Sequence, residues 1–153
     1  MNDTPAELHP AVRALCARFE KLTAQDLDAL MVWYAPDVHF VDPFNDVHNR
    51  AAMRRVFEDM FERLHSPRFT VRHWAVAGTT AYLRWDFDFA IPLWRSTQAG
   101  HIEGMSELHW MAQPDGQWRV RAHWDHWDAG AQVYARLPVL GWLIRRVQRR
   151  LSA

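Results

Sequence analysis

The sequence predicts one α+β domain, because helical and strand patterns occupy separate parts of the 153-residue chain. Apolar residues recur every three to four positions as far as Leu64, and from Ser66 onward they alternate with polar residues. The length suits one domain with a substantial core and is short for two. We therefore expect residues 1–153 to form a single domain in which 129–153 are a C-terminal helical extension.

The N-terminal part contains three predicted helices and one short strand. The first helix follows Pro10, and the segment Thr23-Ala24-Gln25-Asp26 is typical of a capping box that starts the second. Pro36-Asp37 ends the second helix, residues 38–41 form a strand, and Asn49 is a suitable cap for the third helix. The apolar stripes are Val12, Leu15, Phe19 and Leu22; Leu27, Leu30, Met31 and Tyr34; and Met53, Val56, Phe57, Met60, Phe61 and Leu64.

The strand-like segments that follow are joined mainly by short turns. They cover residues 69–74, 81–89, 97–111 and 117–127. Ala77-Gly78-Thr79 and Gln113-Pro114-Asp115-Gly116 are typical of hairpin turns. Neighbouring strands connected in this way predict an antiparallel meander. The tail from Ala129 is predicted to be helical again, with a break or kink at Pro138.

The composition argues against several classes of protein. Lys plus Arg and Asp plus Glu number 18 each, so a net charge of zero gives no general attraction to nucleic acid or anionic membranes. Nine tryptophans favour a dense interior, a hydrophobic ligand site or a subunit interface. Cys16 is the single cysteine, residues 1–5 lack signal-peptide character, and no apolar run approaches the roughly 20 residues of a membrane span. We expect a cytoplasmic protein.

Four short motifs resemble those of a known superfamily. They are Asp26-Leu27-Asp28, Tyr34-Ala35-Pro36-Asp37, Val41-Asp42-Pro43 and Asp125-His126-Trp127-Asp128. Together with the order of helices and strands, they resemble the nuclear transport factor two-like superfamily, in its SnoaL-like and ketosteroid isomerase-like branch. The resemblance implies a cone-shaped fold, in which a curved antiparallel sheet wraps around the N-terminal helices and leaves a deep pocket. It implies no particular chemistry, since this fold hosts enzymes and non-enzymes.

Asp42 is the first candidate catalytic residue. In ketosteroid isomerases the Asp of an Asp-Pro pair after the first strand moves a proton beside a carbonyl, and Asp42-Pro43 resembles that pair. Pro43 holds Asp42 on extended backbone, and a base of this kind needs partial burial to act near neutral pH. The alternative is a turn residue, because Asp-Pro commonly starts turns. The tyrosine and second acid of those enzymes are poorly matched, which argues against steroid isomerisation.

Arg84 and Asp86, together with Asp125, form the second candidate set. Limonene epoxide hydrolases, which the chain also resembles, have Arg-x-Asp on one strand and an Asp near the end of the last strand. The two-residue spacing places Arg84 and Asp86 on one face of a strand. If Leu83 and Trp85 line the pocket, however, this pair faces outward unless a β-bulge changes the phase. A solvated sheet face has the same pattern, so both placements stay open.

The remaining predicted pocket residues are mainly aromatic. They are Trp33, Tyr34, Phe57, Phe61, Glu107, His109 and Trp110. Nine histidines raise the question of a metal site, but His123 and His126 lie on opposite faces of a strand. No stretch has the compact ligand spacing of a metal site. We therefore predict no metal and no cofactor.

The last part of the tail, residues 139–151, carries apolar residues on one side and arginines on the rest. It either packs over the pocket mouth or a second subunit, or lies on a membrane surface. We favour packing, because the segment is short and follows Pro138.

Together these features predict a homodimer that binds a small, largely apolar ligand carrying a carbonyl, hydroxyl or epoxide group. An enzyme of this kind would use cofactor-free acid–base chemistry for isomerisation, cyclisation or hydration, with Asp42 as the first candidate and Asp125 as the second. The alternative is a non-catalytic ligand-binding or accessory domain, because both known catalytic sets are incomplete. We expect no nucleic-acid partner.

Overall fold

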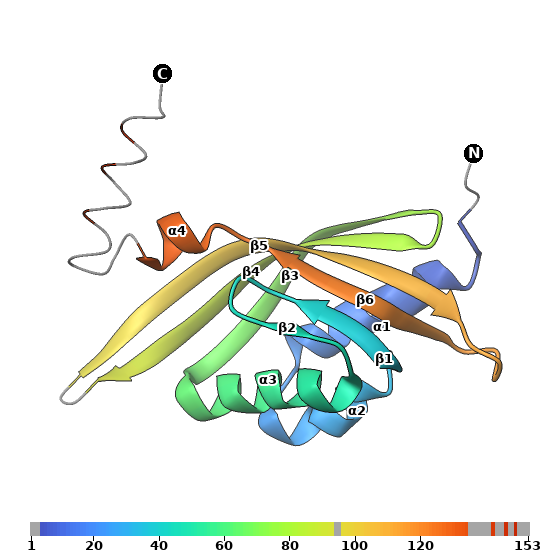
Figure 1. The fold of residues 1–153 in the computed structure, drawn as a ribbon, viewed down its shortest axis with the longest axis horizontal. Coiled ribbons are helices and arrows are strands. Elements are labelled where there is room, and N and C mark those ends of the chain that lie inside the picture. The colour runs from blue at the N-terminus through green and yellow to red at the C-terminus, as the bar shows by residue number, and fades with distance from the viewer. Residues whose placement is uncertain (1–3, 94–95, 135–141, 143–145, 147–148, 150–153) are drawn as a thin grey trace.

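The computed structural model describes residues 4–93, 96–134, 142, 146 and 149. In chain order the elements are α1 (Leu8–Glu20), a 3₁₀ turn η1 (Ala24–Asp26), α2 (Leu27–Met31), β1 (Tyr34–Val41), β2 (Asp46–Val47), α3 (Arg50–Arg63), β3 (His65–Ala77), β4 (Thr80–Leu93), β5 (Ser96–Ala112), β6 (Trp118–His126) and α4 (Ala129–Gln132). One curved sheet has the strand order β2-β1-β6-β5-β4-β3, and it arches over α1, α2 and α3 (Figure 1). The predicted α+β class is confirmed.

Local capping fixes where the helices begin. The backbone N–H and hydroxyl of Thr23 donate to the Asp26 carboxylate at 3.1 and 2.6 Å, which forms the predicted capping box. The Asn49 side chain accepts the N–H of Ala52 at 2.8 Å and caps α3. These short contacts allow the sequence to set both helix starts without tertiary information.

The second helix is shorter than predicted, and Tyr34 belongs to a strand. α2 ends at Met31, and β1 runs parallel to β6 with Tyr34 opposite Val120. The carbonyl of Trp33 accepts the Val120 N–H at 2.9 Å. Pairing with a distant strand therefore overrides the helical spacing of the local sequence. In this position on β1 the Tyr34 side chain is completely buried.

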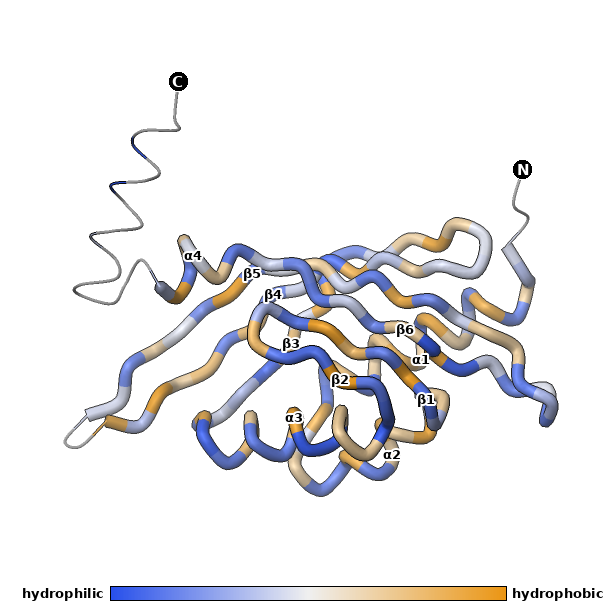
Figure 2. The backbone as a smooth tube through the Cα atoms, in the orientation of Figure 1, coloured by the Kyte–Doolittle hydropathy of each residue, from blue (hydrophilic) through white to orange (hydrophobic). Residues whose placement is uncertain are grey.

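The hydrophobic core lies between the sheet and the three N-terminal helices. Leu15 of α1, Leu30 of α2 and Met53 of α3 are fully buried, and they meet Leu83 and Leu108 of the sheet. Each fully buried side chain of this size contributes about 1.5–3 kcal/mol. Hydrophobic and hydrophilic positions are interspersed along the helices and strands (Figure 2). The predicted apolar stripes thus face one common core.

β4 shows which face of the Tyr82–Asp88 segment points inward. Leu83, Trp85 and Phe87 belong to the core, so Arg84 and Asp86 project from the opposite, outer face of the sheet. The pairing of β3 with β4 shifts register between Val71 and His73. The irregularity therefore lies in β3, and β4 keeps its alternation.

After β6 the chain forms the short helix α4, which is attached to β5. The side chain of Gln132 accepts the Glu103 N–H at 2.7 Å and donates to the Glu103 carbonyl at 3.0 Å. Beyond Tyr134 the structure describes the predicted extension at positions 142, 146 and 149 alone, so the interpretation of 139–151 stays a prediction. Within the described part of the chain, no helix has the length and apolar character required to cross a membrane.

Candidate functional site

A row of hydrogen-bonded polar side chains crosses the inner face of the sheet. The hydroxyl of Tyr34 lies 3.0 Å from Nδ1 of His123, whose Nε2 lies 2.8 Å from Oδ1 of Asp125. Ser106 donates its hydroxyl to the same Asp125 oxygen at 2.5 Å. Trp85 donates its indole N–H to Ser106 Oγ at 2.8 Å. We call these five residues the inner network.

The sheet topology explains why these residues meet. His123 and Asp125 are two positions apart on β6, so both face the core. β6 lies between β1 and β5, and the antiparallel register places Ser106 directly opposite Asp125. The parallel pair on the other side brings β1, and with it Tyr34, next to His123. With Trp85 of β4, the network is therefore a product of four strands rather than of one local motif.

The hydrogen bonds of the network have one consistent direction. Burial, with a smaller contribution from the negative charge of Asp125, raises the pKa of Tyr34 well above its usual range. The phenol therefore keeps its proton and donates to Nδ1 of His123, which assigns the imidazole proton to Nε2. That N–H and the Ser106 hydroxyl both donate to Asp125, as suits an ionised carboxylate.

Asp125 keeps one oxygen free for a ligand. Its Oδ1 receives both hydrogen bonds, and Oδ2 accepts none from the part of the chain that the structure describes. The side chain is 17% exposed, compared with 3% for His123. A carboxylate that is oriented through one oxygen and partly shielded from water is suited to take up and return a proton.

Two spaces adjoin Asp125. A narrow cavity of about 20 Å³ lies under the sheet, and an open hollow of about 480 Å³ lies where β1 ends and β6 continues. The cavity is lined by Phe19, Phe57, Phe69, Val71, Leu83, Trp85, Ser106, His123 and Asp125. The hollow is lined by His39, Val41, Asp42, Pro43, Trp124, Asp125, His126 and Trp127. The cavity has room for about one water molecule, so aromatic rings largely fill the deep pocket that the resemblance implied.

Asp42 lies in the turn that joins β1 to β2. Its Oδ1 accepts the backbone N–H groups of Phe44 and Asn45 at 2.7 and 2.8 Å. The Asn45 side-chain amide donates to both carboxylate oxygens at 3.0 Å. Asp42 therefore performs the turn role that was the alternative to catalysis, although it lines the same open hollow as Asp125.

Arg84 and Asp86 are separated from Asp125 by the sheet. Arg72 contacts Asp86 at 2.6 Å, and Arg84 contacts Glu103 at 2.8 Å. The hydrogen bond from Arg72, together with nearby positive charges, lowers the pKa of Asp86. The hydrolase-like set of one arginine and two carboxylates around one ligand does not form in this arrangement, because its members lie on opposite faces.

The other predicted pocket residues are dispersed. Phe57 lines the narrow cavity and Phe61 packs against the core, whereas Trp33 and Trp110 meet edge-on at 6.4 Å. Glu107 and His109 contact each other at 2.6 Å, on the outer face of β5. Of the seven predicted lining residues, Tyr34 and Phe57 are the two that contribute to the inner network or line its cavity.

The sequence of residues 12–121 matches the family model of the SnoaL-like domain. The chain belongs to the SnoaL-like domain family. AclR from Streptomyces galilaeus, a proposed hydroxylase, has a similar fold with a TM-score of 0.65 at 19% identity, over 90% of this chain and 97% of that one. A proposed SnoaL-like polyketide cyclase from Shewanella denitrificans has a TM-score of 0.66 at 14% identity, over 86% and 100% of the two chains.

An NTF2-like protein of unknown function from Burkholderia pseudomallei is also similar, with a TM-score of 0.67 at 13% identity, over 84% of this chain and 96% of that one. These likenesses confirm the nuclear transport factor two-like fold. No curated protein matches the sequence.

The SnoaL-like family match ends before the most polar part of the site. His123 and Asp125 lie beyond residue 121, so the family match does not itself identify them. The sequence signal that could have found this pair is His-x-Asp on one strand, which places both side chains on one face. Ser106 could not be found in this way, because its position depends on the register between β5 and β6.

Proposed function

We propose that this SnoaL-like protein catalyses a cofactor-free proton transfer on a small, largely apolar carbonyl compound, leading to isomerisation or ring closure. Asp125 is the group that moves the proton. The observation that carries the proposal is its environment: Ser106 and His123 orient Oδ1, Oδ2 accepts no hydrogen bond from the described residues, and the residue lines both the narrow cavity and the open hollow. The similar fold of a proposed polyketide cyclase agrees with this class of chemistry.

The reaction begins when Oδ2 of Asp125 removes a proton from the carbon next to the carbonyl group. The electron pair of the broken C–H bond forms an enolate, and its charge rests on the carbonyl oxygen. In an isomerisation, Asp125 returns the proton to another carbon of the conjugated system. In a ring closure, the enolate carbon attacks a second carbonyl of the same molecule, and the proton passes to the new alkoxide.

The inner network orients the Asp125 carboxylate. His123 and Ser106 donate to Oδ1, so Oδ2 is the oxygen that takes up the proton and returns it. Tyr34 holds the imidazole in the tautomer that donates to Asp125. Tyr34 is therefore a positioning residue, because it acts on the carboxylate through His123.

The substrate is expected to enter from the open hollow. The narrow cavity holds about one water molecule at 20 Å³, so a larger molecule reaches it only when rings such as Phe69 or Trp85 rotate. The carbonyl end of the substrate would then lie beside Asp125, with its apolar remainder against Trp124 and Trp127.

The test is exchange of carbon-bound hydrogen in deuterated water. A panel of small apolar ketones and diketones is incubated with the full chain, and deuterium incorporation is followed by NMR. The wild type should accelerate exchange in at least one compound, and Asp125→Asn should reduce that rate by about 10²–10⁴-fold. Asp37→Asn, which changes an exposed carboxylate on β1, is the matched control and should leave the rate unchanged. Equal rates in the wild type and Asp125→Asn would contradict the proposal.

The small volume of the cavity favours a second candidate function, a ligand-binding or accessory domain without turnover. The same compounds would then quench tryptophan fluorescence as they occupy the hollow beside Trp124 and Trp127, without any hydrogen exchange. Binding without exchange across the panel would favour this function over catalysis.

We also propose that the chain forms a homodimer through the outer face of the sheet. Tyr82, Met105 and Met111 expose 38%, 42% and 38% of their surface there, although they are large and apolar. Light scattering coupled to size exclusion should give the mass of two chains, and Met105→Glu should shift the mass toward that of one. A single-chain mass for the wild type at micromolar concentration would contradict this.

A further inference from the structure

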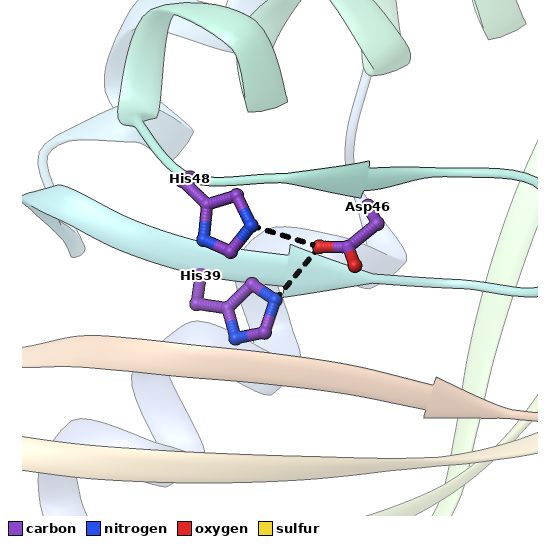
Figure 3. A group of neighbouring side chains, drawn as sticks. All are labelled: His39, Asp46 and His48. Atoms are coloured by element: carbon purple, nitrogen blue, oxygen red, sulfur yellow. Dashed lines mark hydrogen bonds and ion pairs between the residues drawn. The ribbon is translucent and has the colours of Figure 1, made fainter.

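The β1–β2 hairpin brings together three side chains that are common metal ligands. Phe40 pairs with Val47, and Val41 pairs with Asp46. Continuing the same antiparallel register places His39 opposite His48, with both rings on the outer face. Asp46 is two positions from His48 and lies on that face as well. Figure 3 shows the two rings and the carboxylate directed at one another.

The distances between these side chains are close to those of a coordination site. Nε2 of His39 lies 2.8 Å from Oδ1 of Asp46, and Nε2 of His48 lies 3.3 Å from the same atom. One ligand atom from each residue lies within 4.8 Å of the others. A tetrahedral ion with bonds of about 2.0–2.1 Å holds its ligand atoms roughly 3.3 Å apart. Small side-chain rotations are therefore enough to admit an ion.

The surrounding charge also favours a cation at this position. Among the described residues, the ion-pair contacts of Asp46 are with these two imidazoles. A second group, Asp86 with His101 and Glu103, has similar spacing. There, however, Arg72 and Arg84 contact the Asp86 carboxylate at 2.6 and 3.5 Å and already supply positive charge. The two groups have similar spacing, but the arginines make the Asp86 group less favourable for a cation than the Asp46 group.

Ordered elements hold the three side chains in place. β1 lies between β2 and β6, and the His39 ring packs edge-on against Trp124 at 6.1 Å. His48 directly precedes Asn49, whose side chain caps α3. The rings of His39 and His48 stack with centroids 4.3 Å apart and planes 12° apart. Because Asp46 and His48 are exposed, an ion can reach the group directly from solvent.

We propose that His39, Asp46 and His48 bind a divalent transition-metal ion of the zinc, cobalt or nickel type. Two imidazoles and one carboxylate suit such ions, whereas magnesium and calcium prefer oxygen ligands. Three protein ligands leave at least one coordination position for water or an added anion. His39 also lines the open hollow, so the ion is held at its rim, on the opposite face of the sheet from the inner network.

This site differs from the expectation of the sequence analysis, which predicted no metal. The spacing His39-x₆-Asp46-x-His48 is not compact in sequence. It becomes compact because the Asp42–Asn45 turn folds β2 back on β1.

The experiment titrates cobalt into chelator-treated, tag-free protein, and it follows heat release and visible absorption. The wild type should bind about one ion per chain at this site, with the intense absorption of a tetrahedral site rather than that of the hydrated ion. Asp46→Asn and His48→Gln should each weaken binding by at least about tenfold. His65→Gln, which removes an exposed histidine at the start of β3, is the matched control.

A second measurement identifies the site even if a variant folds poorly. In wild-type protein, substoichiometric cobalt should broaden or shift the ring signals of His39 and His48 before those of His65. An excess of magnesium should not compete. Unchanged affinity in the combined Asp46→Asn, His48→Gln variant would overturn the proposal, as would the absence of binding at about 100 μM cobalt.

Discussion

Replacing Tyr34 with phenylalanine tests the inner network through a single atom. The side chain is fully buried and its hydroxyl lies 3.0 Å from Nδ1 of His123. Phenylalanine keeps the ring and its packing, so the change creates almost no cavity. It removes the hydrogen-bond donor and leaves a buried imidazole nitrogen without a partner. Such a loss costs about 1–3 kcal/mol of folding free energy.

Urea unfolding followed by tryptophan fluorescence measures this cost. The midpoint for Tyr34→Phe should fall while the slope of the transition stays the same, since the unfolded surface is unchanged. Tyr134→Phe removes the hydroxyl of a partly exposed side chain just after α4, and it should alter stability by less than about 0.5 kcal/mol. Equal stabilities for Tyr34→Phe and Tyr134→Phe would refute the network as described.

Three further predictions address other parts of the molecule. Burial raises the pKa of the Cys16 thiol to about 12 from 9.0, so native protein should resist alkylation at pH 8. As the pH rises, the thiol ionises in the unfolded chain before it ionises in the folded one, which favours unfolding. The stability contributed by the protonated Cys16 thiol should therefore be complete below pH 9 and lost between about pH 9 and 12, and urea midpoints measured across this range would show the loss. Gly104→Ala would place a Cβ 2.3 Å from the Trp85 ring, so its melting temperature should fall by an amount equivalent to about 1–3 kcal/mol. Asp42→Ala removes four hydrogen bonds of the β1–β2 turn, so it should lower the urea midpoint of unfolding. The variant should still catalyse deuterium incorporation into the ketone substrate, because Asp125 moves the proton.

Local sequence patterns predicted those features of the fold that depend on neighbouring residues. Apolar periodicity located the helices and the meander, and the caps at Thr23 and Asn49 gave two helix starts. The alternation of Leu83 and Trp85 with Arg84 left the inner face of β4 open, and the structure places Leu83 and Trp85 in the core. Features that depend on long-range pairing were missed, namely strand β2 and the inclusion of Tyr34 in β1.

The candidate site was harder to predict for the same reason. The sequence indicates Asp125, but the inner network around it comes from four strands whose mutual register no local pattern specifies. His123 and His126 lie on opposite faces of the strand, and the relevant partner of His123 on its own face is Asp125, two positions away. The sequence therefore indicates which polar residues are candidates for catalysis, whereas the sheet register determines which of them contact one another.

The parallel contact between β1 and β6 constrains the order of assembly during synthesis. Tyr34 and His123 are 89 positions apart, and every other strand of the meander lies between them in the chain. A ribosome that adds about 5–20 residues per second needs roughly 4–18 s to produce the second partner after the first. During that interval α1 can already pack against β3, but β1 lacks β6, its neighbour on one side. That edge of β1 is therefore expected to stay unpaired until the last strand emerges.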